Sequence, residues 1–330
     1  MKRQVLNIKI RQQNRGHGKV VFPKGVLSLF LVFSFVLSSC AKHPASVPIS
    51  KSSSASLKKT HPKFLSQLTE KMYGLKVIPE NKAYQGISIR ALSAFKHPTG
   101  KTSQEEKKIP LIQYGFKIFN NTPKEMGGKI VGDLLSCGSC HLKDGRAPFG
   151  TSLVGVVNRY PRYSPRDKRV IGLKQRIEEC FERSENGKEI SKTGKAMKAL
   201  LAYFAYISRN TPPGTIGYGY GLKPLLLKGA LSLKRFKPSL KIGEKLFVVN
   251  CSKCHGLKGQ GGMDQKANLF APPLWGKQSF NTGAGFNKLK KLIPFVQANM
   301  PYGHGGTLTP EQAEEIAGFV LSHPRPALHP

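Results

Sequence analysis

Two Cys-x-x-Cys-His pentapeptides carry the most distinctive side-chain chemistry in this chain. They consist of Cys137, Cys140 and His141 in one, and of Cys251, Cys254 and His255 in the other. In such a segment both cysteines can bond covalently to the vinyl groups of a c-type haem, and the histidine becomes an iron ligand. The alternative is a pair of redox or zinc sites, but zinc needs further ligands that no second Cys-x-x-Cys near either segment supplies. The pair of segments therefore predicts two covalently bound haem c groups.

Each haem iron has a second axial position, whose ligand helps to set the redox potential and the reactivity. In the second segment Met300 follows His255 and lies shortly before the last predicted helix, where class I cytochromes c keep a methionine ligand. Met263 follows His255 too closely to reach the other side of a haem. We therefore predict that Met300 ligates the second haem, with a core or loop methionine as the alternative. A His/Met pair gives a relatively high potential that suits onward electron transfer.

The first segment is not followed by a comparable methionine, because Met197 falls in the first turn of a predicted helix and is interpreted as a core residue. Cys180 is the one thiol without another assignment. It lies in a predicted helix over 172–185, on the same face as Leu173 and Ile177. Two interpretations remain for Cys180: a small buried core residue, or the second ligand of the first haem.

The neighbours of Cys180 favour the ligand interpretation. Arg176 precedes it by one helical turn and Ser184 follows it by one turn, so all three share one stripe of the predicted helix. A cation beside a thiol favours the thiolate, which is the form that binds iron and attacks sulfur. Arg166 could supply a second guanidinium, and two such groups could hold a small dianion with oxygen atoms. Surface charge is the alternative for each arginine.

The N-terminus has the pattern of a bacterial export signal. Residues 1–25 contain several basic and no acidic side chains, and the apolar run over 26–37 is too short to span a membrane. The sequence up to Cys40 resembles a lipobox, so we expect a signal peptide over 1–39, a lipid on Cys40 and a flexible tether over 40–63. Ordinary signal cleavage without a lipid is the alternative. The pattern predicts a protein on the periplasmic side that its lipid anchors to a membrane.

The formal net charge of the chain is +35 at pH 7. In a cytoplasmic protein this charge would suggest nucleic acid, but an exported protein rarely meets it, so no nucleic-acid partner is expected. A basic surface can steer a small anionic substrate, or an acidic electron acceptor such as another cytochrome c, toward the protein. A generally basic solvated surface is the simpler alternative.

Two modules with the same plan follow the tether. Each begins with a predicted helix, continues into a haem-attachment segment and ends with an amphipathic helix, at 196–208 in the first and 310–322 in the second. Both resemble the small all-helical class I cytochrome c domain, so we predict an all-α chain with two such domains in tandem. The expected boundaries are 64–208 and 238–324 for the domains, 209–237 for a Pro- and Gly-rich linker, and 325–330 for a tail.

Three motifs give a more specific resemblance. The segments Cys137-Gly-Ser-Cys140-His141-Leu, Tyr-Pro-Arg162-Tyr and Arg176-Ile-Glu-Glu-Cys180-Phe-Glu-Arg-Ser resemble the dihaem thiosulfate dehydrogenases. The resemblance extends over roughly residues 64–324. It implies a catalytic domain with a His/Cys-ligated haem and a second domain with a transfer haem. The implied reaction joins two thiosulfate ions into one tetrathionate with release of two electrons, or runs in reverse.

The resemblance also implies roles for individual residues. Cys180 matches the haem-ligating cysteine of the family, and Met300 lies in the segment that ligates the second haem. Arg166 and Arg176 match the arginines of the substrate site, and Ser184 matches a serine beside them.

The chain departs from the family pattern at two positions near these residues. Asn299 stands where some members have a lysine that exchanges with the following methionine, so that exchange is not available here. Glu185 stands where the family usually has methionine, which would add a negative charge near the anion site. Lipid anchoring is also not a general trait of the family.

Other functions for a dihaem chain remain as alternatives. A non-catalytic dihaem electron-transfer lipoprotein would need Cys180 only as a core residue. A subunit like the Cys-ligated cytochrome of the Sox sulfur-oxidation complex would need a partner protein and a second cytochrome, whereas this chain has its own predicted His/Met haem. A dihaem peroxidase would need a different arrangement of histidines.

Overall fold

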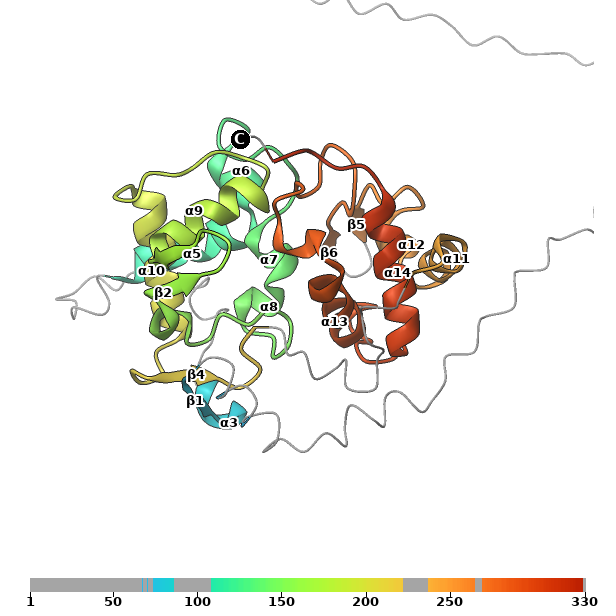
Figure 1. Cartoon of the computed structure of the whole chain (residues 1–330). Coiled ribbons are helices and arrows are strands. Elements are labelled where there is room, and N and C mark those ends of the chain that lie inside the picture. Colours follow the sequence, from blue (N-terminus) through green and yellow to red (C-terminus); the bar gives the residue numbers. More distant parts are fainter. Residues whose placement is uncertain are drawn as a thin grey trace, which may run out of the picture. The chain divides into compact units, whose positions relative to one another are not determined.

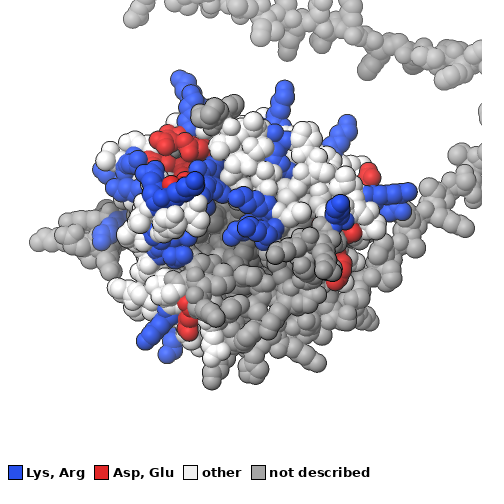
Figure 2. Space-filling model, in the orientation of Figure 1, with Lys and Arg blue, Asp and Glu red and all other residues white. Residues whose placement is uncertain are grey.

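The computed structural model describes residues 67, 70, 74–85, 108–221, 237–264 and 269–328 (Figure 1). The predicted signal peptide, the lipid site at Cys40, the tether and residues 222–236 of the predicted linker lie outside the described residues. In these ranges, no helix combines the length and the hydropathy that crossing a membrane requires. Lysine and arginine side chains predominate over acidic ones on the face seen in Figure 2, in line with the net charge of +35.

Short and medium-length helices form most of the first module. They are α3 (Glu80–Ala83), α5 (Ile109–Asn120), α6 (Thr122–Met126), α7 (Cys137–Cys140), α8 (Leu142–Gly145), α9 (Leu173–Arg183) and α10 (Lys195–Ile207), with the 3-10 helix η2 (Val156–Arg159). Helix α5 packs across α10, as predicted for the first and last helices of this module. The crossing is close because Gly115 faces the Ala199 backbone, where a Cβ atom would lie 2.1 Å from the carbonyl oxygen.

The core of the first module lies where α5, α9 and α10 meet. Phe119, Tyr203, Leu200 and Phe181 are almost completely buried there. Met197 is fully buried in the same core, as predicted. Burying each of these large apolar side chains stabilises the fold by about 1.5–3 kcal/mol.

The second module repeats the crossing of its first and last helices. It contains α11 (Leu240–Asn250), α12 (Ser252–His255), α13 (Leu289–Asn299) and α14 (Pro310–Ser322), with the 3-10 helix η4 (Gly285–Asn287). A Cβ atom on Gly243 of α11 would lie 2.3 Å from the carbonyl oxygen of Glu315 of α14. Helix α14 has the predicted bounds and starts with a capping box, in which the side chains of Thr309 and Gln312 each accept a hydrogen bond from the other's backbone N–H.

Three short two-stranded sheets supplement the helices in the described residues. They pair β1 (Lys76–Ile78) with β4 (Thr215–Gly217), β2 (Arg162–Ser164) with β3 (Arg169–Ile171), and β5 (Gly262–Asp264) with β6 (Leu269–Ala271). The parallel β1–β4 pair aligns Val77 with Ile216. Ile216 and Tyr220 are buried in the first core, so residues 209–221 of the predicted linker pack as part of the first module.

The two modules contact each other along their chains. Leu135 of the first module packs with Phe280 and Ala284 of the second. The side-chain amide of Asn281 donates a hydrogen bond of 2.7 Å to the carbonyl oxygen of Glu182 in α9. The predicted tail also packs onto the second module, since the backbone N–H of Leu328 donates to the hydroxyl of Thr282.

Candidate functional site

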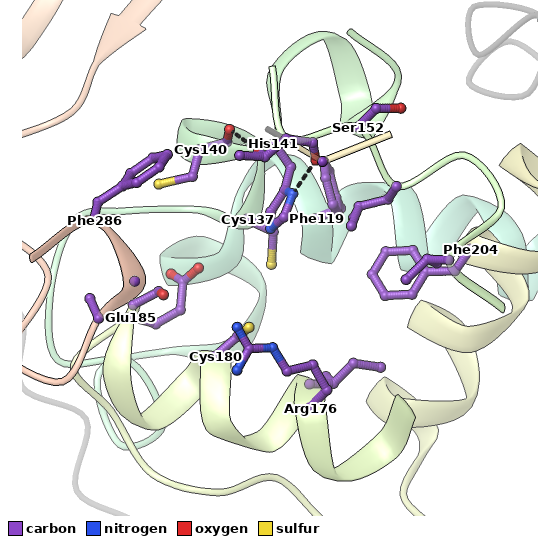
Figure 3. Close-up of a pocket in the computed structure, with 18 of the residues that line it drawn as sticks. Phe119, Cys137, Cys140, His141, Ser152, Arg176, Cys180, Glu185, Phe204 and Phe286 are labelled. Atoms are coloured by element: carbon purple, nitrogen blue, oxygen red, sulfur yellow. Dashed lines mark hydrogen bonds between the residues drawn. The ribbon is translucent and has the colours of Figure 1, made fainter. Parts of the chain in front are cut away.

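A cavity of about 450 Å³ lies between the first haem-attachment segment and α9 (Figure 3). This volume falls in the usual range of cofactor and ligand pockets. Six predicted site residues line it: Cys137, Cys140, His141, Arg176, Cys180 and Ser184. The fold therefore brings the first attachment segment and the proposed catalytic side chains, except Arg166, to one place.

Both attachment histidines are oriented by a backbone carbonyl. The Nδ1 atom of His141 lies 2.7 Å from the carbonyl oxygen of Thr151, and that of His255 lies 2.9 Å from the carbonyl oxygen of Pro272. Burial lowers the pKa of His141 to about 4 and also lowers the pKa of His255, so both rings are neutral at pH 7. A neutral imidazole that donates from Nδ1 presents Nε2 to a metal. Both segments therefore fit a haem that is ligated through Nε2.

Cys180 lies across this cavity from His141 (Figure 3). It is on α9, whose bounds are close to the predicted helix over 172–185 and whose residue Phe181 packs into the core. Burial raises the pKa of the Cys180 thiol, and the charge of Arg176 offsets this effect only in part. The cysteine is only partly buried and lines the cavity, which fits an iron ligand better than a core residue.

Arg176 is held by a carboxylate that sequence analysis did not single out. Its Nη1 atom donates a hydrogen bond of 2.8 Å to Oε2 of Glu179, and Arg183 pairs with the same oxygen at 2.9 Å. The charge of Cys180 and the contact with Glu179 raise the pKa of Arg176, against the effect of burial. Glu179 therefore fixes the guanidinium beside the Cys180 sulfur. The i, i+3 spacing of Arg176 and Glu179 on a predicted helix could have indicated this pair.

Arg166 is exposed and is not among the side chains that line the cavity. Burial and the charges of Arg183 and Arg176 lower its pKa, so it lies within electrostatic reach of Arg176 without entering the cavity. Other basic side chains line the cavity: Arg159, Arg162, Lys290 and Lys291. Sequence analysis missed the two lysines because they belong to the second module, and only the tertiary structure brings them to the first.

Glu185 also lines the cavity, and it is buried. Burial raises the pKa of Glu185 well above its ordinary value, and the nearby carboxyl of Asp133 raises it further. The neutral form of Glu185 is therefore favoured. From the sequence, Glu185 was expected to add a negative charge near the anion site. Its raised pKa makes this charge smaller than expected.

Met300 and the second attachment segment pack against one hydrophobic core. Cys251, Trp275 and Met300 all contact this core. Met263 lies on β5 with 57% of its surface exposed. Met300 is thus the methionine placed beside the second attachment site, and its ligation to iron stays a prediction.

The segment that carries Met300 also contacts the first module. Met300 packs in a small cluster with Leu142, the residue directly after His141. The side-chain amide of Asn299 donates a hydrogen bond of 3.1 Å to the carbonyl oxygen of Phe149, close to the loop that orients His141. The two predicted haem sites are therefore joined through a few contacting residues.

Comparison with known proteins assigns both modules. Residues 132–212 match the family described as SoxA/TsdA, cytochrome c domain, and residues 238–320 match the family described as cytochrome c oxidase, cbb3-type, subunit III. The thiosulfate dehydrogenase of Allochromatium vinosum is 40% identical over 223 residues, which cover 65% of this chain and 78% of that protein. The chain belongs to the thiosulfate dehydrogenase family. The two matched modules confirm the prediction of two tandem cytochrome c domains, which bind haem c covalently.

A second relative and a solved structure support the membership of the chain in the thiosulfate dehydrogenase family. The thiosulfate dehydrogenase of Psychrobacter arcticus is 33% identical over 231 residues, which cover 70% of this chain and 68% of that protein. A solved structure of thiosulfate dehydrogenase TsdBA from Marichromatium purpuratum, in its as-isolated form, matches with a TM-score of 0.59 and 28% identity. The match covers 72% of this chain and 50% of that one, so this chain corresponds to about half of the solved protein.

Proposed function

We propose that this protein couples two thiosulfate ions to one tetrathionate at the first haem, and that the electrons leave through the second haem. The observation that carries the proposal is the cavity in which Cys180 and Arg176 face His141 (Figure 3). His141 and Cys180 would hold the iron of the first haem, and His255 and Met300 would hold that of the second. The same site lowers the barrier in both directions, so tetrathionate reduction follows the same path in reverse.

The chemistry centres on the sulfur of Cys180. When bound, the first haem supplies an electron acceptor next to this sulfur. The Cys180 thiolate and one thiosulfate form a sulfur–sulfur bond and lose two electrons, of which the first and the second haem would each accept one, and a thiosulfonate group remains on the cysteine. A second thiosulfate attacks this group, releases tetrathionate and restores the thiolate. Charge balances, because one thiolate and two dianions yield one thiolate, one tetrathionate dianion and two electrons.

Positive charge in the cavity lowers the cost of bringing two dianions together. Arg176 is fixed by Glu179 before substrate arrives, so little reorganisation is needed when charge develops. The hydroxyl of Ser184 lines the same cavity and can donate to a substrate oxygen. The raised pKa of Glu185 favours its neutral form, which does not repel an anion.

The contacts between the modules provide a route for the electrons. Leu142 follows His141 directly and packs in a cluster with Met300. Asn299 ties the Met300 segment to the loop of the first module through its hydrogen bond to Phe149. Electrons from the first haem therefore need to pass only a short packed region to reach the second.

The surroundings of the second attachment segment suit delivery of electrons to another protein. The apolar side chains of Val248, Val249 and Leu257 are exposed there. Lys253 and Lys258 are exposed beside them. An apolar patch with lysines at its edge favours docking of a redox protein with an acidic surface, such as another cytochrome c.

We further propose that the chain is exported and carries a lipid on Cys40, which anchors it on the periplasmic side of a membrane. Covalent haem attachment supports export, because c-type haem is attached outside the cytoplasm. The test is a Cys40→Ala variant with an intact export signal. We expect this variant in the soluble periplasmic fraction, and retention in the membrane fraction would contradict the lipid anchor.

The test of the proposed reaction uses the purified protein with both haems attached. Thiosulfate is added with ferricyanide as acceptor, and ferricyanide loss and tetrathionate are measured together for the wild type and Cys180→Ala. We expect two ferricyanide ions to be reduced per tetrathionate in the wild type, and no turnover in the variant. Absence of turnover in the fully loaded wild type, or unchanged turnover in Cys180→Ala, would contradict the proposal.

A further inference from the structure

Helix α13 begins with three lysines at the end of a helix where positive charge is unfavourable. Lys288 directly precedes the helix, Lys290 and Lys291 lie in its first turn, and that turn holds no acidic residue. The N-terminal end of a helix carries a partial positive charge, so each lysine there costs free energy. Burial and the charges of Lys290, Arg162 and Arg176 lower the pKa of Lys291. The start of α13 is therefore electrostatically unfavourable as it stands.

Two of these lysines line the cavity of the other module. Lys290 and Lys291 belong to the second module, yet both line the cavity that contains Cys180. Arg162 of the first module lines the same cavity. Lys288 does not line it, although it is exposed at the same helix end. Lys288 therefore has the same charge as Lys290 and Lys291 and lies at the same helix end, but only the other two line the cavity.

The cations of this group lack a matching negative charge. In the part of the chain that the structure describes, no ion pair joins Arg162, Lys290 or Lys291 to a carboxylate. The Nε atom of Arg162 is buried and has no hydrogen-bond partner. A buried donor without a partner costs about 1–3 kcal/mol. A bound anion would satisfy this donor and would offset the repulsion between the three cations.

We propose that Arg162, Lys290 and Lys291 form a second anion seat in the cavity, separate from the seat at Arg176. The inference rests on the proposed function and adds the place of the second substrate ion. One thiosulfate reacts at Cys180 beside Arg176, and the other is held by the second seat before it attacks. In reverse, the second seat holds the far sulfonate group of tetrathionate.

The charge available at Arg176 is too small for both substrate ions, so a second group of cations is needed. The Nη1 atom of Arg176 forms an ion pair with Oε2 of Glu179 at 2.8 Å, which partly neutralises the guanidinium. This single, partly neutralised guanidinium offsets only part of the negative charge that the thiosulfonate on Cys180 and the second thiosulfate ion bring to the cavity. Arg162, Lys290 and Lys291 add three positive charges without a carboxylate partner among the described residues. The second module therefore completes the substrate site as well as receiving the electrons.

The test compares Lys290→Gln/Lys291→Gln with the matched control Lys288→Gln in the dihaem protein. Because neither lysine is part of a hydrophobic core of the described residues, their replacement leaves the core intact. Three readouts are needed: KM and kcat for thiosulfate, the calorimetric Kd of tetrathionate for the oxidised protein, and the midpoint potential of each haem. For the double variant we expect KM and Kd to rise about tenfold at low ionic strength, with kcat and the potentials nearly unchanged. We expect Lys288→Gln to change KM and Kd by less than about twofold.

Three outcomes would overturn the second seat. Unchanged KM and Kd in the double variant would do so, and so would equal effects of the control, which would indicate only the general field of the protein. A shifted potential of the first haem with unchanged Kd would show that the lysines neutralise haem propionates instead. Failure of the proposed reaction gives a different result, since the wild type would then form no tetrathionate while calorimetry still reports whether the two lysines bind the anion.

Discussion

The first and second modules share the way they hold a histidine but differ in what surrounds the haem site. His141 and His255 each donate to a backbone carbonyl, and Gly115 and Gly243 permit the same helix crossing. The first site faces a cavity with a thiol, a guanidinium and lysines from the other module. The second has a methionine nearby and exposed apolar side chains around its attachment segment. The first site thus has a cavity lined by a thiol and basic side chains, whereas the surroundings of the second attachment segment are exposed and apolar.

Among variants that keep Cys180, the largest effect should come from the guanidinium of Arg176, which Glu179 holds in the first site. Arg176→Leu should lower kcat/KM for thiosulfate about a hundredfold, because a preorganised positive charge at the reacting anion is lost. Glu179→Gln keeps the guanidinium of Arg176 but removes the charged partner that orients it, so we expect kcat/KM to fall about tenfold. Steady-state assays on protein with full haem content measure both. The control is Arg169→Leu on β3, which is exposed, and an equal loss there would remove the special role of Arg176.

Loss of the Met300 side chain should slow electron exit through the second haem without preventing reduction of the first. Met300→Leu should slow turnover with a protein acceptor at least about tenfold, because the second iron loses its proposed high-potential ligand. Reduction of the first haem by thiosulfate in a single turnover should persist. Stopped-flow absorbance measures the two phases. Met263→Leu is the matched control, since Met263 is exposed on β5, and a similar defect there would contradict ligation by Met300.

A smaller effect should appear at the exposed edge of the second module. Lys253→Glu should lower the second-order rate of electron transfer to an acidic cytochrome about threefold to fivefold at low ionic strength, because attraction becomes repulsion. The difference should vanish at high salt. Laser-flash or stopped-flow kinetics measure this rate. Lys198→Glu, exposed on α10 of the first module, should have no such effect, and an equal effect would place docking elsewhere.

The smallest effect concerns Asp133, a buried acid of the first module. Burial raises the pKa of Asp133 from 3.8 to about 7. The folded state therefore binds a proton that the unfolded state releases, so stability is greatest below about pH 4 and falls as the pH rises through about 7. Asp133→Asn should be more stable than the wild type by about 1–2 kcal/mol at pH 8 and equal to it at pH 4. Thermal unfolding at both values measures this, and an equal difference at both would contradict it.

Local patterns in the sequence were sufficient to predict much of the site. The apolar stripe and the caps placed α9 and α14, and helical spacing put Arg176, Cys180 and Ser184 on one stripe that does line one cavity. These features depend on residues within a few turns of each other. Side-chain type and spacing determine them without knowledge of the tertiary fold.

Features that depend on distant segments could not be predicted in this way. Lys290 and Lys291 reach the first site only because the modules pack together. The pairing of β1 with β4 drew residues 215–217 into the first module, although their composition suggested a linker. Arg166 was proposed as a second guanidinium near Cys180 and then by its match to a family position, but its exposed side chain is not among those that line the cavity. Its role in the reaction stays a prediction.

Cys180 is the proposed second iron ligand of the first haem, and Met300 is the proposed second iron ligand of the second haem. The most direct measurement is the electron paramagnetic resonance spectrum of the oxidised dihaem protein, compared between the wild type and Cys180→Ala. We predict one ferric signal with a thiolate ligand and one with a His/Met pair in the wild type, and loss of the thiolate signal alone in the variant. A variant spectrum identical to that of the wild type would contradict the account, because Cys180 would then be a core residue and not a ligand.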